Sequence, residues 1–326
     1  MAVIGKDIAR AVALLEDGAL VAIPTETVYG LAANALDPVA VSRIFEVKNR
    51  PRFDPLILHV SDIENIQGLV AEFPDAARRL AECCMPGPLT LLLPKSERVA
   101  DIVTAGSSRV AVRIPRHPMT LEVLRLAGFP LAAPSANPFG YISPTTANHV
   151  EAQLGEQIPY ILDGGACEVG VESTIVGWDE QGDMVVYRKG GIPIEEIRKL
   201  VGPVKVLPHS VSRPDAPGML VSHYAPRVPM VIGNIPELLE QYATKQVGVI
   251  AFRDTYPMVP SSRQVALSKR GDFAEAARRL FAGMRALDRL GLDVILAELV
   301  PEEGLGRAIN DRLRRAAAQE WDEKIA

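Results

Sequence analysis

Helix-type and strand-type hydrophobic periods alternate along most of this chain of 326 residues, and this alternation constrains its fold more than any other feature. Ile8, Val12 and Leu15 share one face of a predicted helix. Gly18 ends that helix, and a short apolar strand is predicted over 19–23. Chains with this alternation fold as layers of helices packed on a sheet, so the predicted class is α/β.

The alternation continues through the first two hundred residues. Further helices are predicted over 38–44, 75–84, 119–126 and 147–154. Further strands are predicted over 56–60, 89–93, 110–114, 131–133, 160–162 and 173–176. Several of these strands follow one another with no helix between them, which favours a mixed sheet over a purely parallel one.

Repeated prolines interrupt both periods between 202 and 229, which indicates a connecting segment. The predicted organisation is a catalytic domain over 1–201, a proline-rich connector or lid over 202–229 and a second domain over 230–326. In the second domain, strands are predicted over 230–232, 247–252 and 294–299, and helices over 236–242, 273–290 and 305–317. That pattern predicts a smaller, three-layer α/β domain of the Rossmann type.

Composition and charge exclude several classes of protein. Apolar residues make up 48% of the chain and charged residues 23%, as in ordinary folded proteins. No apolar stretch approaches the roughly 20 residues that span a bilayer, and no secretory signal pattern begins the chain, so we expect a cytoplasmic protein. The formal net charge of −5 argues against binding nucleic acid through bulk electrostatics. The cysteines Cys83, Cys84 and Cys167 form neither a disulfide framework nor a metal-binding pair, and we expect all three to be buried.

Common nucleotide and hydrolase motifs, including the phosphate loop and the dinucleotide-binding glycine motif, are absent from the sequence. The residues that can carry chemistry lie instead in loops that follow predicted strands. The first such loop is P-T-E-T-V-Y-G, where Thr25, Thr27 and Tyr29 gather at a place that α/β sheets use for ligands. The alternative is a capped turn in which the threonines satisfy backbone groups.

The second loop, K-N-R-P, places two cations one residue apart. Lys48 and Arg50 can both point at one phosphate group. The alternative is a solvated helix end, where cations meet the negative end of the helix dipole. Asp54 follows this loop, and the next strand ends near His59, which is either catalytic or a satisfied core histidine.

Two later strands carry arginines. Alternation in R-V-A-V-R-I-P puts Arg109, Ala111 and Arg113 on one face and the valines on the other. Arg113 can fork a carboxylate, or it can form a surface ion pair of little value. Further along, Ser173 and Arg188 can add a hydroxyl and a cation to the same cleft.

The loop P-S-A-N places Ser135 and Asn137 just past another predicted strand. Ser143 and Thr145 are expected at the start of the next helix, where free backbone amides are a natural seat for a phosphate. A helix cap explains Ser143 and Thr145 equally well, but it does not explain a hydroxyl and an amide at a strand exit.

Taken in this order, P-T-E-T-V-Y-G, K-N-R-P with a downstream P-L-I-L-H, V-R-I-P, P-S-A-N, S-P-T and E-S-T-I-V resemble the YrdC-type threonylcarbamoyl-AMP synthases. The resemblance covers about residues 6–200. The connector, with A-P-G-M over 216–219 and H-Y-A-P over 223–226, is similar to that of the longer, two-domain branch. The implied fold is a YrdC-like twisted mixed sheet with a large concave basic cavity, followed by the second domain.

The resemblance implies an enzyme that forms threonylcarbamoyl-adenylate and pyrophosphate from L-threonine, bicarbonate and ATP. Lys48 and Arg50 are the implied catalytic residues, at the phosphates, and Arg113 is the implied partner of the threonine carboxylate. The implied ATP site comprises Lys48, Arg50, Asp54, Asn137, Thr145, Arg188 and Tyr224. The implied L-threonine site comprises Thr27, Tyr29, His59, Arg113, Ser135 and Ser173.

The implied reaction is a nucleotidyl transfer that needs no side-chain nucleophile. Mg²⁺ arrives with ATP, and no protein metal site is implied. The product serves threonylcarbamoyladenosine modification of tRNA, so the implied partners are the small-molecule substrates, a tRNA threonylcarbamoyl transferase complex and a weak tRNA contact. Oligomeric state, the role of the second domain and the choice between carbon dioxide and bicarbonate stay open.

Two other functions remain as alternatives. A basic cavity of this kind can bind double-stranded RNA or tRNA without catalysis, although the acidic net charge disfavours it. The same fold can also serve carbamoyl transfer in hydrogenase maturation or act as a sugar-phosphate lyase. The first normally carries zinc-finger and acylphosphatase-like segments, and the second needs clustered acidic metal ligands, and neither feature is found in this sequence.

Overall fold

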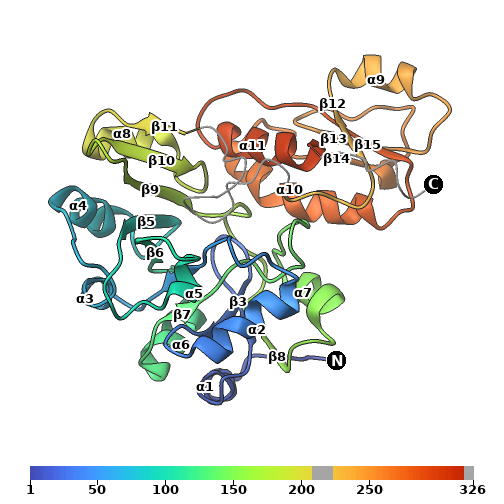
Figure 1. Cartoon of the computed structure of the whole chain (residues 1–326). Coiled ribbons are helices and arrows are strands. Elements are labelled where there is room, and N and C mark those ends of the chain that lie inside the picture. Colours follow the sequence, from blue (N-terminus) through green and yellow to red (C-terminus); the bar gives the residue numbers. More distant parts are fainter. Residues whose placement is uncertain (208–222, 319–326) are drawn as a thin grey trace. The chain divides into compact units, whose positions relative to one another are not determined.

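The computed structural model describes residues 1–207 and 223–318. Residues 208–222 of the expected connector, with the A-P-G-M motif, lie outside the described residues. The described chain forms two compact units (Figure 1). The first comprises Met1–Phe139 and 143–207, and the second comprises Gly140–Ile142 and 223–318.

The first unit is built on a mixed sheet of eleven strands in the order β1-β8-β2-β3-β7-β4-β6-β5-β9-β10-β11. Neighbouring strands are parallel at β4 and β6 and antiparallel at β5 and β6, so the predicted mixed sheet is confirmed. The strands are β1 (Val3–Gly5), β2 (Val21–Ile23), β3 (Gly30–Asn34), β4 (Ile57–His59), β5 (Leu89–Pro94), β6 (Arg109–Arg113), β7 (Leu131–Ala132), β8 (Tyr160–Leu162), β9 (Thr174–Trp178), β10 (Met184–Arg188) and β11 (Lys205–Val206).

The helices of the first unit begin at side-chain caps in several places. The carboxylate of Asp37 accepts a hydrogen bond from the backbone N–H of Val39, and Pro38 fits the first turn because its missing N–H has no intrahelical acceptor there. The hydroxyl of Thr146 caps the helix that begins at Ala147 by accepting a hydrogen bond from the N–H of His149. The helices are α1 (Ile8–Glu16), α2 (Pro38–Lys48), α3 (Ile63–Gln67), α4 (Asp75–Cys84), α5 (Asp101–Thr104), α6 (Pro118–Ala127), α7 (Ala147–Leu154) and α8 (Ile194–Val201).

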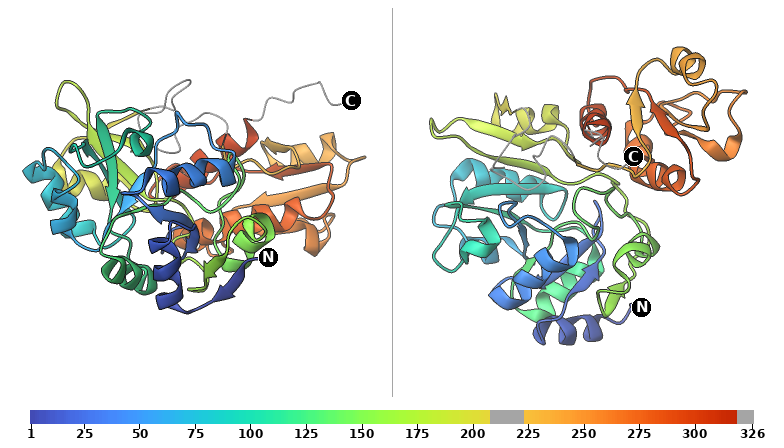
Figure 2. Two further views of the ribbon diagram at one scale, coloured as in Figure 1. Left: turned by 60° about the horizontal axis from the view of Figure 1, so that its bottom comes forward. Right: turned by 45° about the vertical axis from the view of Figure 1, so that its right-hand side comes forward.

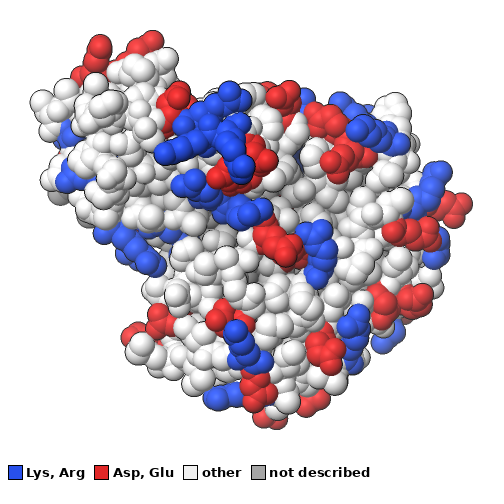
Figure 3. All heavy atoms as spheres, turned by 180° about the vertical axis from the view of Figure 1, so that it is seen from behind, with Lys and Arg blue, Asp and Glu red and all other residues white. Residues whose placement is uncertain are grey.

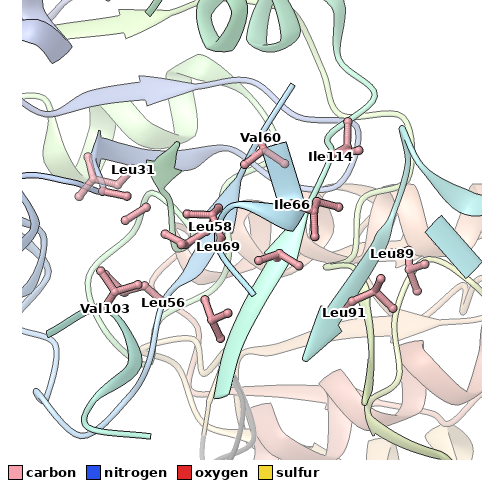
Figure 4. Close-up of a cluster of buried hydrophobic side chains, with 14 of the residues drawn as sticks. Leu31, Leu56, Leu58, Val60, Ile66, Leu69, Leu89, Leu91, Val103 and Ile114 are labelled. Carbon is pink, nitrogen blue, oxygen red and sulfur yellow. The ribbon is translucent and has the colours of Figure 1, made fainter. Parts of the chain in front are cut away.

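Helices cover the sheet according to the alternation of its strands. Val21 and Ile23 face α1 and α6, which lie side by side in Figure 1, whereas Ala22 faces the main core. Figure 4 shows part of that core, to which Leu58 of β4, Leu91 of β5 and Ile66 of α3 belong. Burial of each such side chain stabilises the fold by about 1.5–3 kcal/mol.

The opposite face of the middle strands carries a smaller apolar cluster whose members all come from strands. Ala111 of β6 belongs to this cluster, while Val110 and Val112 pack into the main core. The predicted division of this strand into two faces is therefore confirmed, with Arg113 on the same face as Ala111.

The second unit has a parallel sheet in the order β12-β15-β13-β14. Val249 and Ala251 share an apolar cluster with residues of α9, whereas α10 packs against the same strand from the side that Gly248 faces, so helices cover both faces (Figures 1 and 2). This is the predicted three-layer arrangement. Its elements are β12 (Met230–Ile232), α9 (Ile235–Gln241), β13 (Val247–Ala251), a 3₁₀ turn (Ser261–Arg263), β14 (Gln264–Ala266), α10 (Phe273–Asp288), β15 (Val294–Ala297) and α11 (Gly306–Ala317).

A short excursion of the chain, Gly140–Ile142, belongs to the second unit. The backbone oxygen of Gly140 accepts a 2.8 Å hydrogen bond from the N–H of Ala225. The hydroxyl of Tyr141 donates to Asp288, and the guanidinium of Arg285 donates to the backbone oxygen of Ile142. These three residues are thus built into the second unit although they follow the P-S-A-N loop in the sequence.

Two expectations from the sequence are wrong. Cys83 is exposed and Cys84 is half-buried, so only Cys167 is buried among the three cysteines. The reason is the face of α4, which buries Ala77, Leu80 and Ala81 and turns the next-to-last position outward. The helix after the S-P-T segment begins at Ala147, so Ser143 and Thr145 precede its cap rather than begin it.

Candidate active site

The turn between β2 and β3 is held by Thr25. Its Oγ1 accepts hydrogen bonds from the backbone N–H of Thr27 and of Val28, at 3.1 and 3.2 Å. The same oxygen lies 2.8 Å from the hydroxyl of Thr27 and 2.6 Å from the backbone oxygen of Val28. Thr25 therefore forms the capped turn that was the alternative reading of this loop, and the turn fixes Thr27.

Tyr29 ties this turn to the segment after β8. Its hydroxyl donates a 2.8 Å hydrogen bond to the backbone oxygen of Gly165 and accepts one of 3.2 Å from the N–H of Gly164. Burial raises the pKa of this phenol well above its usual value. Tyr29 is thus neutral and holds a glycine segment in place.

Lys48 ends α2 and reaches the P-S-A-N loop. Its Nζ donates a 2.6 Å hydrogen bond to the backbone oxygen of Ser135 and a second bond to that of Asn137. The side chain is buried, and burial lowers the pKa of Lys48 well below its usual value, with the nearby charge of Arg50 adding to the effect. The lysine is therefore buried against the P-S-A-N loop and is not the solvated helix end that was the alternative.

The direction of Arg50 is set by a left-handed residue. Asn49 adopts a positive φ of 51° and ends α2, which turns the chain so that Arg50 points inward. Nε of Arg50 donates to the backbone oxygen of Asp54 at 3.0 Å, and Nη2 donates to that of Pro55 at 2.7 Å. Nη2 also forms a buried ion pair of 2.9 Å with the Asp54 carboxylate, so this acid holds the arginine in place.

The P-S-A-N loop lies against the P-T-E-T-V-Y-G loop. Ser135 forms an isolated antiparallel bridge with Gly30, and the N–H of Ala136 donates to the backbone oxygen of Tyr29 at 2.8 Å. Asn137 is buried, and its amide donates to the backbone oxygen of Pro138 at 2.9 Å. The structure thus brings the P-T-E-T-V-Y-G, K-N-R-P and P-S-A-N loops together.

His59 and Arg113 end two neighbouring parallel strands, where their Cα atoms are paired in register. Both side chains are buried. Burial lowers the pKa of His59 to about 3, and the positive charge of Arg113 adds to this. His59 is therefore a neutral imidazole beside a guanidinium, suited to exchanging hydrogen bonds rather than carrying charge.

A carboxylate that the sequence analysis did not single out contacts Arg113. Oε1 of Glu26 lies 2.8 Å from Nη2 of Arg113, and both side chains are buried. Oε2 of Glu26 accepts a 3.0 Å hydrogen bond from the backbone N–H of Arg116. The sequence feature that could have pointed to Glu26 is its place between two threonines directly after a buried strand.

Ser173 and Arg188 meet at the start of β9 and the end of β10. Nε of Arg188 donates to the backbone oxygen of Ser173 and Nη2 donates to its hydroxyl, each at 3.0 Å. The same hydroxyl lies 2.7 Å from that of Thr90 on β5, a second contact residue that the sequence analysis missed. The predicted hydroxyl and cation are therefore adjacent.

The S-P-T segment is linked to the same loops. The hydroxyl of Ser143 donates a 2.5 Å hydrogen bond to the carboxylate of Glu172, which was also missed. The backbone oxygen of Pro144 accepts a 2.9 Å bond from the N–H of Tyr29. Thr145 is buried, and its hydroxyl lies 3.3 Å from Nδ1 of His149.

Tyr224 belongs to the second unit, whereas the other predicted site residues belong to the first. Its ring is 4.9 Å from the guanidinium carbon of Arg312 and 4.7 Å from that of Arg315. The ring centre of Phe281 lies 5.5 Å away. The residue also adopts a positive φ of 66°, an uncommon conformation for an aromatic residue, so surrounding contacts hold it there.

The described residues hold neither a cluster of metal-binding side chains nor a membrane-spanning helix. Over 1–207 and 223–318, no three side chains of His, Cys, Asp or Glu are grouped so that they could hold a metal ion. Within the same residues, no helix is long and apolar enough to cross a bilayer.

Comparisons with known proteins identify the family. A family model described as "Telomere recombination", that of the Sua5/YciO/YrdC proteins, matches residues 13–190. A second, described as "Threonylcarbamoyl-AMP synthase, C-terminal domain", matches residues 192–318.

Two relatives and one solved structure are similar along nearly the whole chain. Threonylcarbamoyl-AMP synthase of Pyrococcus abyssi is 44% identical, covering 94% of this chain and 93% of its own. That of Bacillus subtilis is 40% identical, covering 95% and 92%. The crystal structure of P. abyssi Sua5 complexed with L-threonine has a TM-score of 0.91 at 42% identity and covers 97% of each chain. The chain therefore belongs to the Sua5/YciO/YrdC family, in the two-domain form that carries the threonylcarbamoyl-AMP synthase C-terminal domain.

Proposed function

We propose that this protein is a threonylcarbamoyl-AMP synthase, which forms threonylcarbamoyl-AMP and pyrophosphate from L-threonine, bicarbonate and ATP. The observation that carries the proposal is the likeness, over more than nine-tenths of both chains, to relatives that bear this name. The first unit adds support because it holds buried cations, a pair of hydroxyls and a forked guanidinium, the groups that a triphosphate and an amino acid need.

The ATP site in this proposal is built around Lys48 and Arg50. Both can meet phosphate oxygens, Arg50 as a fork and Lys48 as a point charge. Asp54 belongs to the proposed ATP site and keeps Arg50 oriented through their 2.9 Å ion pair. The remaining ATP contacts in the proposal are Asn137, Thr145, Arg188 and Tyr224.

The L-threonine site is assigned to the strand ends. Arg113 takes the carboxylate, since a buried guanidinium binds a carboxylate more strongly than an exposed one. Neutral His59 is suited to the amine or the hydroxyl of the substrate, because it can accept a hydrogen bond. The other proposed contacts are Thr27, Ser135 and Ser173, and the ring of Tyr29 lines the pocket.

The chemistry is a nucleotidyl transfer in two bond-forming steps. The threonine amine forms a bond to the carbon of bicarbonate, with loss of water, or to that of carbon dioxide, with loss of a proton. A carbamate oxygen then attacks the α-phosphorus of ATP, and the bond to the pyrophosphate oxygen breaks. No covalent enzyme intermediate is needed, so the protein acts by positioning the reactants and stabilising charge through Lys48 and Arg50.

Mg²⁺ enters this reaction as part of the nucleotide substrate. Magnesium commonly keeps phosphate oxygens and water as its ligands and needs few groups from the protein.

The product is an activated carbamate that another enzyme must transfer. We place the activity in the cytoplasm, upstream of a tRNA threonylcarbamoyl transferase complex that receives this intermediate for modification of tRNA. A weak tRNA contact is compatible with the reaction but not required by it.

RNA binding without catalysis is the main competing function. Such binding draws its affinity from neutralised phosphates and needs a strong excess of positive charge. The formal net charge is −5, and on the face shown in Figure 3 the Lys and Arg side chains lie among Asp and Glu side chains. A catalytic function therefore fits better.

The proposal is tested by measuring pyrophosphate release from ATP with purified full-length protein, bicarbonate and Mg²⁺. Release that depends on L-threonine, is much slower with L-serine and is abolished in Lys48→Ala and Arg50→Ala supports it. Lys199→Ala, which removes an exposed lysine at the end of α8, serves as the matched control and keeps full activity. Absence of release with any amino acid, together with tight and salt-sensitive RNA binding, would overturn the proposal.

A further inference from the structure

We propose that Glu26 is a positioning residue whose carboxylate orients the guanidinium of Arg113 to receive the carboxylate of L-threonine. The inference rests on the proposed function, which gives Arg113 that task. It adds a residue, Glu26, that is expected to act on threonine binding through Arg113 and without touching the substrate.

The geometry around Glu26 is fixed at three points. Oε1 lies 2.8 Å from Nη2 of Arg113, and Oε2 accepts a 3.0 Å hydrogen bond from the N–H of Arg116. The backbone oxygen of Glu26 accepts a 2.7 Å bond from the N–H of Val169. The carboxylate therefore cannot swing away from Arg113 without giving up the bond to Arg116.

Arg113 depends on this acid for its balance of charge. Its side chain is 4% exposed and that of Glu26 is 2% exposed, so water screens the pair poorly. The neighbouring His59 is neutral and supplies no negative charge. Breaking a buried ion pair leaves an uncompensated charge, and the remaining partner must then move or recruit water.

The contacts of Arg113 also define which side of its guanidinium is offered to a ligand. Nε donates to the backbone oxygen of Gly87 at 3.3 Å, and Nη2 faces Glu26. Among the described residues, no side chain pairs with Nη1 of Arg113. A planar fork held at Nε and Nη2 presents its Nη1 side to a substrate carboxylate in one orientation.

Glu26 has two opposing effects on an incoming anion. By orienting Arg113 it strengthens binding of the threonine carboxylate, and by its own negative charge it weakens that binding. Glu26→Gln separates the two effects, because the amide keeps the shape and an acceptor for the N–H of Arg116 but loses the charge. Glu26→Ala removes both the charge and the contacts.

The experiment measures KM for L-threonine, KM for ATP and kcat by pyrophosphate release in the full-length protein. If orientation dominates, KM for L-threonine rises about tenfold or more in Glu26→Ala and about threefold in Glu26→Gln, as expected for loss of a charge-assisted contact. KM for ATP stays within about twofold, because the Lys48 and Arg50 contacts do not include Glu26. A lower KM for L-threonine in Glu26→Gln would overturn the proposal, since neutralisation would then be the larger effect.

A double-mutant cycle with Arg113→Lys tests whether Glu26 acts through Arg113. Lysine keeps the charge but loses the fork, so Arg113→Lys alone raises KM for L-threonine. If Glu26 acts only through that fork, adding Glu26→Gln to Arg113→Lys changes KM little further, and the two effects are strongly non-additive. Additive effects would overturn the proposal.

The matched control is Glu168→Gln. Glu168 forms an exposed ion pair of 3.2 Å with Arg116, close in sequence to Arg113, so its loss tests a carboxylate of the same region outside the buried pair. Unchanged kinetics are expected for this variant, because exposed pairs contribute little.

The failure of this inference can be told apart from the failure of the proposed function. Wild-type protein without threonine-dependent pyrophosphate release defeats the function. Active wild-type protein with an unchanged KM for L-threonine in both Glu26 variants defeats only the role of Glu26. An equal rise of KM for L-threonine and KM for ATP, with a lower melting temperature, would show a merely structural role for Glu26 and would also overturn the proposal. If Glu26→Ala does not fold, the same comparison is made with Glu26→Gln.

Discussion

Nζ of Lys48 donates a 2.6 Å hydrogen bond to the backbone oxygen of Ser135, so the end of α2 and the P-S-A-N loop are joined 87 residues apart in the sequence. A second bond to Asn137 uses another of the three ammonium protons. In the proposed ATP site, a charged Lys48 has its third proton left for a phosphate oxygen. Lys48 can thus shape the loop and contact the nucleotide at the same time.

Lys48→Met is expected to abolish activity and to lower stability. Methionine has nearly the same length but cannot donate, so the two carbonyl groups lose their partner at a cost of about 1–3 kcal/mol each. Loss of the charge at the phosphates reduces kcat by about a hundredfold or more. Pyrophosphate release and thermal unfolding check both effects, and Lys199→Met is the exposed control. Normal activity in Lys48→Met would contradict the assigned role.

The neutrality of His59 predicts a pH dependence of stability. The pKa of His59 is lowered to about 3 in the folded protein, whereas an unfolded histidine titrates near about 6.5. Between these values the unfolded chain binds one more proton, so the free energy of unfolding falls as the pH falls, by about 1.4 kcal/mol per unit. From about pH 7 to about pH 5 the loss due to His59 is about 2 kcal/mol.

Urea unfolding across that pH range checks the prediction for His59. His59→Gln removes the titrating group, so its stability should depend less steeply on pH than that of the wild type. Equal slopes in the two proteins would mean that His59 takes up a proton in the folded state.

Tyr29→Phe separates a structural from a substrate-binding role for this hydroxyl. The variant loses the bond to Gly165 and leaves the N–H of Gly164 without its acceptor, which costs about 1–3 kcal/mol. We expect a lower melting temperature with KM for L-threonine changed by less than about threefold, because this hydroxyl is already occupied. An unchanged melting temperature with a large rise in KM would assign the hydroxyl to the substrate instead.

Tyr224 is expected to stabilise the second unit. Tyr224→Ala removes an aromatic ring that contacts Arg312, Arg315 and Phe281, and should cost about 3–5 kcal/mol. Tyr224→Phe keeps the ring and should be nearly as stable as the wild type. A raised KM for ATP in Tyr224→Phe would support the predicted nucleotide contact, whereas wild-type stability of Tyr224→Ala would contradict the packing role.

The sequence predicts elements with a clear period better than those without one. The helix over 75–84 and the strand over 160–162 are observed with the same bounds. Strand β3, G-L-A-A-N, is not predicted, because it is buried on both faces and shows no alternation. Strand β10 is missed because its end reads as the glycine segment Y-R-K-G-G.

The residue types of the site follow from the sequence, but their contacts do not. Lys48, Arg50 and Arg113 stand out because cations and prolines follow predicted strands and helices. Glu26 pairs with Arg113 across 87 positions, and that pairing depends on the order of strands in the sheet. Local periodicity carries no information about such order, so the acid could not be assigned a partner.

The excursion Gly140–Ile142 has a consequence for how the protein can be divided. Because these residues are built into the second unit, the backbone passes between the units at this loop as well as through the connector. If a protease cut the connector, the contacts of Tyr141 and Ile142 with the second unit would therefore still hold the two fragments together. A shortened chain that stops before the connector would keep Tyr141 and Ile142 but strip them of Asp288 and Arg285, so such fragments should be designed with this loop in mind.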